Sequence, residues 1–483
     1  MANDSLRQKT LSGIIWGFFE KFSTQLVTFI VGIILARLLS PSDYGLVAMV
    51  TVFVTISGVI VDSGFSSALI RKKDRTDLDY STVFDINVGM SVIMASLLCL
   101  CAPLIASYFR QPIITKILYF DALYIFLGSF ISVQGTKLYA DLQFKARSTI
   151  NVINSFAQGI VSIAMAITGC GVWSLIVPKI ITIFSGATLY WHYQHWFPGC
   201  KFSKKSAVEM FAFGSKLLIS TIINVVYQNL YPIVIGKKFS SSDLGFYSKS
   251  SSFSSLPATT FTNVIGSVAF PVLSSIQNDK ERLANAYRKM LRISAYILFP
   301  IMISLAVLAR PFVVVLITEK WLPCVIMLQI LCFDMMWYPI HALNLNLLQV
   351  SGRSELFLKL EIIKKAIGIS VLAITIKYGI LWMCVGSVFC SLIALFINTY
   401  YTGKLINLGW GTQMKDLIPS LMVSVFMGIG IYLIDLALSN DYAKLFTGIL
   451  AGIVLYYTFS RLFHLKELAF LQEIIKNNII HRK

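Results

Sequence analysis

Long apolar stretches separated by short polar turns dominate the chain. A helix needs about 20 apolar residues to cross the hydrocarbon core of a bilayer. Fourteen stretches of roughly that length occur, at 12–36, 45–69, 81–107, 114–136, 149–168, 172–193, 210–236, 250–275, 292–317, 323–349, 356–376, 379–402, 417–437 and 443–463. The pattern predicts an all-α polytopic membrane protein, with the turn 169–171 separating the fifth and sixth helices.

Two short polar motifs occur twice in the chain. The first motif reads LSPSDYG at residues 39–45 and FSSSDLG at residues 239–245. The second reads LQFKARS at residues 142–148 and LQVSGRS at residues 348–354. In the first motif, Ser and Asp can satisfy the free N–H groups of the following helix, and Gly relaxes the backbone. The nearly equal spacing of the two pairs predicts that the chain contains two copies of one module.

The repeat suggests a division into two lobes and a tail. We expect an N-terminal lobe of helices 1–6 at 1–200, a C-terminal lobe of helices 7–12 at 201–405, and two additional helices with a basic cytoplasmic tail at 406–483. An even number of helices per copy gives both lobes the same orientation. A pseudo-twofold axis along the membrane normal should then relate them.

Composition agrees with a membrane protein. Hydrophobic residues make up 56% of the chain and charged residues only 13%, where soluble domains carry about 25%. The net charge of +18 has a topological explanation, because basic residues accumulate in cytoplasmic loops. With both termini in the cytoplasm, that side holds roughly three times as many Lys and Arg residues as the other. No basic stretch is interleaved with aromatic residues, so a nucleic-acid partner is not expected.

Two stretches resemble amphipathic helices at the cytoplasmic face. One opens at Ser206 with a capping-box pattern, and the other runs over 278–292, with apolar residues on one side and basic residues on the other. Both fit ordinary connectors next to the membrane, and both also fit segments that couple the two lobes.

Polar residues inside the apolar helices are the informative ones, because a charge in hydrocarbon is costly and usually faces a cavity or a partner. The first helix carries Glu20, Lys21 and Gln25. The seventh carries a series at i, i+4 spacing together with Tyr227: Lys216, Ser220, Asn224 and Gln228. Such stripes fit the wall of a central cavity, and polar contacts between helices are the alternative. Lysine is poorly suited to that alternative, so we expect Lys21 and Lys216 to face one cavity.

Other intramembrane polar residues are weaker candidates. Asp334 interrupts an apolar run in the tenth helix, Lys179 follows Pro178 in the sixth, and Arg37 ends the first. Further residues of this kind are Asp62, Asp85, Asn87, Asp121, His341 and Asp435.

The sequence contains no motif that predicts catalysis. Asp77-Leu78-Asp79 has the DxD spacing of metal-dependent sugar transferases but lies in a short basic loop. There is no P-loop and no GxSxG motif, and the eight cysteines form no CxxC pair. No catalytic residue, metal or cofactor is therefore expected, and the first apolar run reads as a retained helix rather than a cleaved signal.

Several motifs together resemble a known family. These are ILARLLSPSDYG at 34–45, DSGFSSALI at 62–70, GVWSL at 171–175, FPVLSSIQND at 270–279 and EKW at 319–321. They are similar to the polysaccharide flippases of the multidrug/oligosaccharidyl-lipid/polysaccharide (MOP) exporter superfamily, and most similar to the Wzx/WzxC-like branch that exports lipopolysaccharide and exopolysaccharide. The resemblance covers residues 5 to about 360.

The resemblance implies a flippase that moves polyprenyl-pyrophosphate-linked oligosaccharide across the bacterial inner membrane for O-antigen, capsule or exopolysaccharide synthesis. Membrane lipids, a polysaccharide polymerase and other assembly proteins are the implied partners. Relatives carry an acidic residue near Tyr231-Pro232, which this chain lacks. The alternatives are a related exporter of lipid II or of small molecules and, from another class, a polyprenyl-dependent glycosyltransferase or polymerase. The latter class resembles chains with a long catalytic loop, which this sequence lacks.

Overall fold

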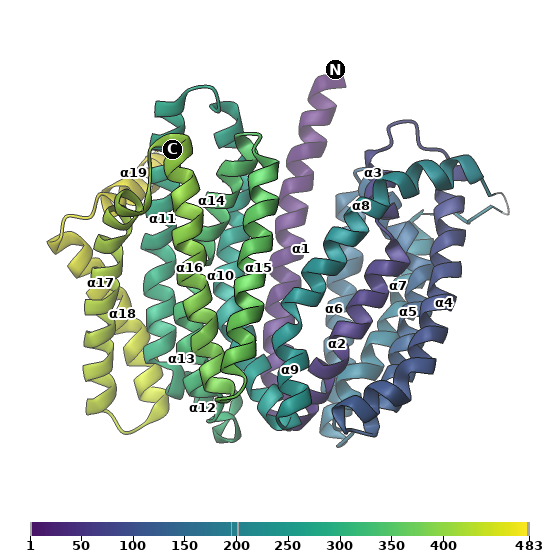
Figure 1. Cartoon of the computed structure of the whole chain (residues 1–483), viewed down its shortest axis with the longest axis horizontal. Coiled ribbons are helices and arrows are strands. Elements are labelled where there is room, and N and C mark those ends of the chain that lie inside the picture. The colour runs from purple at the N-terminus through teal and green to yellow at the C-terminus, as the bar shows by residue number, and fades with distance from the viewer. Residues whose placement is uncertain (1, 195, 200–201, 481–483) are drawn as a thin grey trace. The chain divides into compact units, whose positions relative to one another are not determined.

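The computed structural model describes residues 2–194, 196–199 and 202–480, and every regular element within these residues is a helix. The chain divides into two compact units, one ending at Gly245 and the other beginning at Phe246 (Figure 1). Helix α10 (Ser241–Ser275) contains this division. The all-α class predicted from the apolar pattern is confirmed, whereas the lobe limits at 200 and 405 stay predictions.

In the part of the chain that the structure describes, the first unit consists of nine helices and the first turn of α10. Within it, α4 packs along α5, and α6 packs between α1 and α7. The helices are α1 (Ala2–Leu38), α2 (Pro41–Asp62), α3 (Phe65–Arg71), α4 (Asp77–Phe109), α5 (Ile113–Ala140), α6 (Phe144–Ile167), α7 (Trp173–Gln194), α8 (Lys204–Gln228) and α9 (Leu230–Lys238).

The second unit continues α10 and then forms a bundle in which α11 packs along α17, and α17 packs along α18. Its helices are α11 (Lys280–Val307), α12 (Ala309–Ile317), the 3₁₀ turn η1 (Glu319–Trp321), α13 (Cys324–Met335), α14 (Tyr338–Val350), α15 (Ser354–Thr375), α16 (Ile380–Ile406), α17 (Trp410–Ala437), α18 (Asp441–Leu462) and α19 (Lys466–Ile480).

Thirteen segments in the described part of the chain have the length and hydropathy to cross a membrane. The fourteenth stretch of the sequence pattern, 356–376, forms α15, a helix of 22 residues. Its first twelve residues include Lys359, Glu361, Lys364 and Lys365. The Lys364 ammonium lies 2.5 Å from the Glu361 carboxylate, so part of this charge is neutralised along the helix.

Proline interrupts three spans that the apolar pattern predicted to be continuous. Helix α8 ends at Gln228, α11 at Val307 and α13 at Met335, and in each case a proline follows four residues later, at 232, 311 and 339. Proline has no N–H for the carbonyl four residues before it and its ring crowds that carbonyl. The spans 210–236, 292–317 and 323–349 are therefore each two helical segments.

The repeated Ser-Asp turn caps a helix in both copies, as predicted. In the first copy, the Asp43 carboxylate accepts a hydrogen bond of 2.9 Å from the Ser40 N–H, and the Asp43 N–H donates to Ser40 Oγ. In the second, Asp243 and Ser240 repeat both contacts at 3.1 Å. Each copy thus forms a capping box at the start of a helix, α2 or α10.

The glycine of this turn has a different role from the one expected. Gly45 and Gly245 lie inside their helices rather than in the turn, and each faces the backbone of the other copy. A Cβ atom on Gly45 would lie 1.8 Å from the Ser241 carbonyl oxygen, and one on Gly245 would lie 1.9 Å from the Pro41 carbonyl oxygen. The hydroxyls of Ser42 and Ser241 are 2.7 Å apart at the same contact. Glycine is required because two backbones approach closely.

The second repeated motif connects helices in both copies, but its register differs from the sequence match. Helices α6 and α15 begin at Phe144 and Ser354. Leu142 and Gly352, each two residues earlier, both have positive φ, at 58° and 69°. The sequence match pairs residue 142 with 348, whereas the turn geometry pairs 142 with 352. The structural alignment of the two copies therefore differs from the sequence match by four residues.

Both predicted amphipathic stretches continue directly into spanning helices. Helix α8 begins three residues earlier than the capping-box pattern indicated, because the Ser203 hydroxyl accepts from the Ser206 N–H. Asp279 caps α11, which runs without interruption to Val307. Tyr287 on the apolar side of α11 is fully buried, as the pattern predicted.

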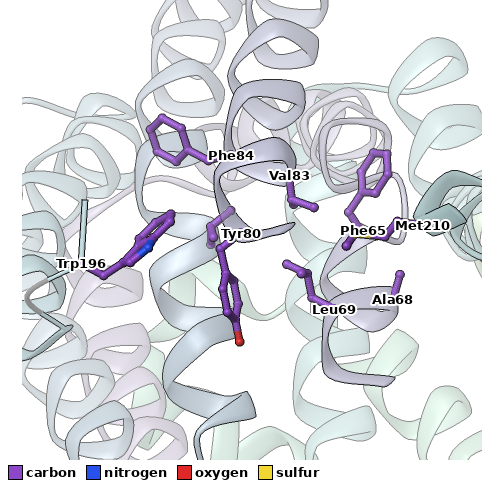
Figure 2. Packing of buried hydrophobic residues seen from close by; sticks show 9 residues of the cluster. Phe65, Ala68, Leu69, Tyr80, Val83, Phe84, Trp196 and Met210 are labelled. Atoms are coloured by element: carbon purple, nitrogen blue, oxygen red, sulfur yellow. The ribbon is translucent and has the colours of Figure 1, made fainter. Parts of the chain in front are cut away.

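A buried apolar cluster fixes the beginning of α8 within the first unit. Figure 2 shows Phe65 and Leu69 of α3 beside Tyr80 of α4, with Met210 of α8 and Trp196 completing the cluster. One turn after Met210, Gly214 packs on the break between α2 and α3, where its Cβ would lie 2.4 Å from the Ser63 carbonyl oxygen. These contacts determine which face of α8 is covered.

Candidate substrate-binding surface

A polar stripe runs along the uncovered face of α8. Met210 and Gly214 are buried against the rest of the first unit, whereas Lys216 is exposed. Two residues correspond to about 200° of rotation on a helix, so Lys216 lies opposite Gly214. The residues that follow it at i+4 spacing, Ser220, Asn224 and Gln228, are also exposed, and Tyr227 beside them is half-buried.

Helix α1 presents a second exposed polar face. It packs on α6 through Val27, Val31 and Leu35, and Gly159 of α6 allows a close approach, since a Cβ there would lie 2.6 Å from a Val31 methyl. Lys21 and Gln25, one turn apart, are exposed on α1. Both belong to a segment with the hydropathy of a membrane span.

Glu20 faces the neighbouring helices instead. Its carboxylate accepts a hydrogen bond of 2.6 Å from the Asn151 amide and one of 2.9 Å from the Ser148 hydroxyl, both on α6. The Tyr190 hydroxyl of α7 donates to the Asn151 Oδ1 atom at 2.9 Å. The chain Glu20–Asn151–Tyr190 therefore connects α1, α6 and α7, so adjacent residues of α1 have separate environments.

We expect Glu20→Ala to lower the thermal stability of the purified protein. It removes two charge-assisted hydrogen bonds, each contributing about 1.5–3 kcal/mol. Glu20→Gln should retain most of the stability, because an amide oxygen still accepts from Asn151. Thermal unfolding in detergent measures both effects. A Gln variant as unstable as Glu20→Ala would show that the negative charge, and not the hydrogen bonds alone, stabilises this contact.

Two further predicted cations have different environments. The Lys179 ammonium of α7 lies 3.8 Å from the Asp121 carboxylate of α5, whose side chain is 1% exposed. Lys179 therefore compensates a buried acid between helices. Arg37 is exposed in the last turn of α1. Nine of the ten predicted site residues belong to the first unit, and Asp334 belongs to the second.

Asp334 lies in a polar region of the second unit. It lies beside Ser387 and Ser391 of α16. His341 of α14 contacts the Ser391 hydroxyl through Nε2 at 3.1 Å and the Asn398 amide through Nδ1 at 3.3 Å. The two contacts fit a neutral imidazole that accepts at Nδ1 and donates from Nε2.

The sequence interpretation missed two buried polar clusters in the second unit. In the first, the Thr402 hydroxyl donates to Asn344 Oδ1 at 2.6 Å, and the Gln413 amide joins Asn344 to the Tyr287 hydroxyl. In the second, Asp416 accepts from two arginines of α11. The sequence signal for the first cluster was Asn344 within the largely apolar run at 342–350, which also contains Asn346 and Gln349.

Comparison with known proteins identifies the family. The model of the polysaccharide biosynthesis protein family matches residues 34–326. The chain is 26% identical to an uncharacterized membrane protein in the cps region of Klebsiella pneumoniae, over 83% of each chain. It is 23% identical to the lipopolysaccharide biosynthesis protein WzxC of Escherichia coli (strain K12), over 90% of this chain and 88% of that protein.

A solved structure shows the same fold. The lipid II flippase MurJ in its inward closed conformation superposes with a TM-score of 0.74 at 17% identity, covering 94% of this chain and 99% of that one. The resemblance to polysaccharide exporters predicted from the sequence motifs is confirmed. With thirteen segments among the described residues suited to span a membrane and a family match over more than half of its length, this chain belongs to the polysaccharide biosynthesis protein family of membrane proteins.

Proposed function

We propose that this protein is a flippase that moves polyprenyl-pyrophosphate-linked oligosaccharide from the cytoplasmic to the periplasmic leaflet of a bacterial inner membrane, with both termini cytoplasmic. It acts as a transporter and not as an enzyme. Membership of the polysaccharide biosynthesis protein family supports a role in polysaccharide synthesis. The observation that carries the proposal is the exposed polar stripe of α8 that begins at Lys216.

A spanning helix with four exposed polar residues in series is unfavourable against lipid. A charged residue at mid-membrane costs several kcal/mol unless it faces water or a partner. The stripe therefore supports an aqueous cavity on this side of α8, and the exposed Lys21 of α1 supports a second cationic wall.

Different types of residue in the proposed site would bind different parts of the cargo. Lys21 and Lys216 provide cations for the pyrophosphate, and Gln25, Asn224 and Gln228 provide hydrogen-bonding groups for the sugar. Tyr227, Arg37, Lys179 and Asp334 complete the proposed set. The lipid tail remains in the bilayer while the lobes 1–200 and 201–405 alternate access. Residues 406–483 add two spanning helices, α17 and α18, and a basic tail that contains α19.

We expect Lys21→Ala and Lys216→Ala each to leave the protein inserted in the membrane but to block export of surface polysaccharide. Each removes a cation that would pair with the pyrophosphate away from bulk water. Surface polysaccharide on cells lacking the chromosomal gene measures the effect. Lys205→Ala is the matched control, because Lys205 is an exposed lysine in the first turn of the same helix, α8. Normal export in either variant removes that lysine from the site.

The cargo is tested directly in reconstituted liposomes. Purified protein should move a labelled polyprenyl-pyrophosphoryl glycan between leaflets, and should move labelled lipid II or a cationic dye no faster than empty liposomes do. Transport of lipid II or dye alone would reassign the protein to the corresponding exporter class.

A further inference from the structure

A basic hollow lies in the second unit where α19 packs against the beginning of α11. Its volume is about 210 Å³, several times the roughly 30 Å³ that a water molecule occupies in the liquid. The lining includes Arg288, Lys289 and Arg292 of α11 and Lys466 of α19, with Phe470 as an apolar wall. None of these residues belongs to the proposed cargo site.

Two of the cations are held in place by a buried carboxylate. Asp416 of α17, whose side chain is 3% exposed, accepts from Arg288 Nε and Nη2 at 2.7 and 2.8 Å and from Arg292 Nε at 2.9 Å. Arg292 Nη2 also donates to Asp416. A guanidinium has five N–H groups. Each arginine therefore keeps further donors on the side away from Asp416, in a fixed orientation.

The hollow retains positive charge after this pairing. Four basic side chains face two acidic ones, Asp416 and the lining residue Glu467, which leaves a net charge of about +2 in a site suited to phosphate. The Lys289 ammonium lies 3.5 Å from the centre of the Phe470 ring. Cationic groups and an apolar wall thus occur together, as a headgroup joined to an acyl chain requires.

The position of the hollow favours a lipid headgroup as its phosphate-containing ligand. Helix α19 begins at Lys466, four residues after the spanning helix α18 ends at Leu462, and α11 continues from this region into a spanning segment. Leu465 is buried against Tyr296 and Val423, which holds the start of α19 against the bundle. The hollow therefore lies beside the ends of two segments with the hydropathy of membrane spans, where lipid headgroups would meet the protein.

We propose that this hollow binds the phosphate headgroup of an anionic phospholipid of the surrounding leaflet. Arg288 and Arg292 would orient the phosphate, Lys289 and Lys466 would neutralise it, and Phe470 would contact the glycerol and the first acyl carbons. Basic pockets between membrane helices bind anionic headgroups by these interactions. The proposal is independent of the cargo.

The test uses the full-length protein with Lys289→Gln and Lys466→Gln combined, which leaves the arginine pairs with Asp416 intact. The probe is short-chain phosphatidylglycerol in detergent, and saturable stabilisation against thermal unfolding is measured. At about 1 kcal/mol per lysine, the double variant should bind roughly 30-fold more weakly. The control is Lys280→Gln with Lys476→Gln, which removes one exposed lysine from each of the same helices without touching the hollow.

The outcomes separate the lipid from other sources. The site is supported if phosphatidylglycerol stabilises the wild-type protein and the control variant but not the double variant Lys289→Gln/Lys466→Gln. Equal stabilisation by inorganic phosphate at the same concentration overturns the lipid assignment, because the headgroup alone would then suffice. Equal loss in the control, or equal binding of phosphatidylcholine, overturns the site, because binding would then reflect surface charge or hydrophobic contact in general.

Discussion

Asp416→Ala should lower the stability of the second unit. The substitution leaves Arg288 and Arg292 without the carboxylate that both contact. Removing one partner of a fully buried ion pair typically costs about 3–5 kcal/mol. The side chains of Arg288 and Arg292 are 36% and 28% exposed and line the basic hollow, so solvent compensates part of the lost pairing and we expect a cost below that range. The measurement is the yield and thermal unfolding of purified protein.

Two variants isolate the cause of this loss. Asp77→Ala removes a carboxylate that is 75% exposed and 3.3 Å from the Lys137 ammonium, and an exposed pair of this kind contributes at most about 1 kcal/mol. Combining Asp416→Leu with Arg288→Met and Arg292→Met removes all three charges and should recover much of the lost stability. A triple variant as unstable as Asp416→Ala would show that packing at this position, and not uncompensated charge, causes the loss.

Gly45→Ala and Gly245→Ala should each abolish export and destabilise the protein. A single methyl group would lie within 2 Å of a backbone carbonyl oxygen, at Ser241 or Pro41, and backbone cannot rotate away as a side chain can. Helices α2 and α10 must separate, which also breaks the contact between the Ser42 and Ser241 hydroxyls. Overpacking of this kind costs about 1–3 kcal/mol or more. Thermal unfolding and surface polysaccharide are the two measurements.

Gly58→Ala provides the matched control for these variants. Gly58 lies on α2 as Gly45 does, and a Cβ there would meet nothing within 4 Å. Alanine favours a helix over glycine by up to about 1 kcal/mol. Stability should therefore be unchanged or higher in Gly58→Ala. If Gly45→Ala behaves like Gly58→Ala, the close backbone contact is not required.

The sequence alone determined the class of the protein and many of its helix ends. Spans follow from length and hydropathy, because the bilayer requires every backbone group to be satisfied within a helix. The caps of α2 and α10 follow from Ser and Asp at fixed spacing. The helix ends at 228, 307 and 335 each precede a proline by four residues. The sequence did not predict these breaks, because other prolines lie inside helices that continue through them: Pro103, Pro178, Pro257, Pro271, Pro300 and Pro419.

Only the tertiary structure decided which polar residues are exposed and which connect helices. Glu20 and Lys21 are neighbours in the sequence, yet Glu20 contacts α6 whereas Lys21 is exposed. The same holds for Asp416, whose partners lie more than 120 residues away, and for Gly45, whose role depends on Ser241. Periodicity gives the direction of a side chain around its own helix, but the neighbouring helix that it meets is fixed by packing between distant segments.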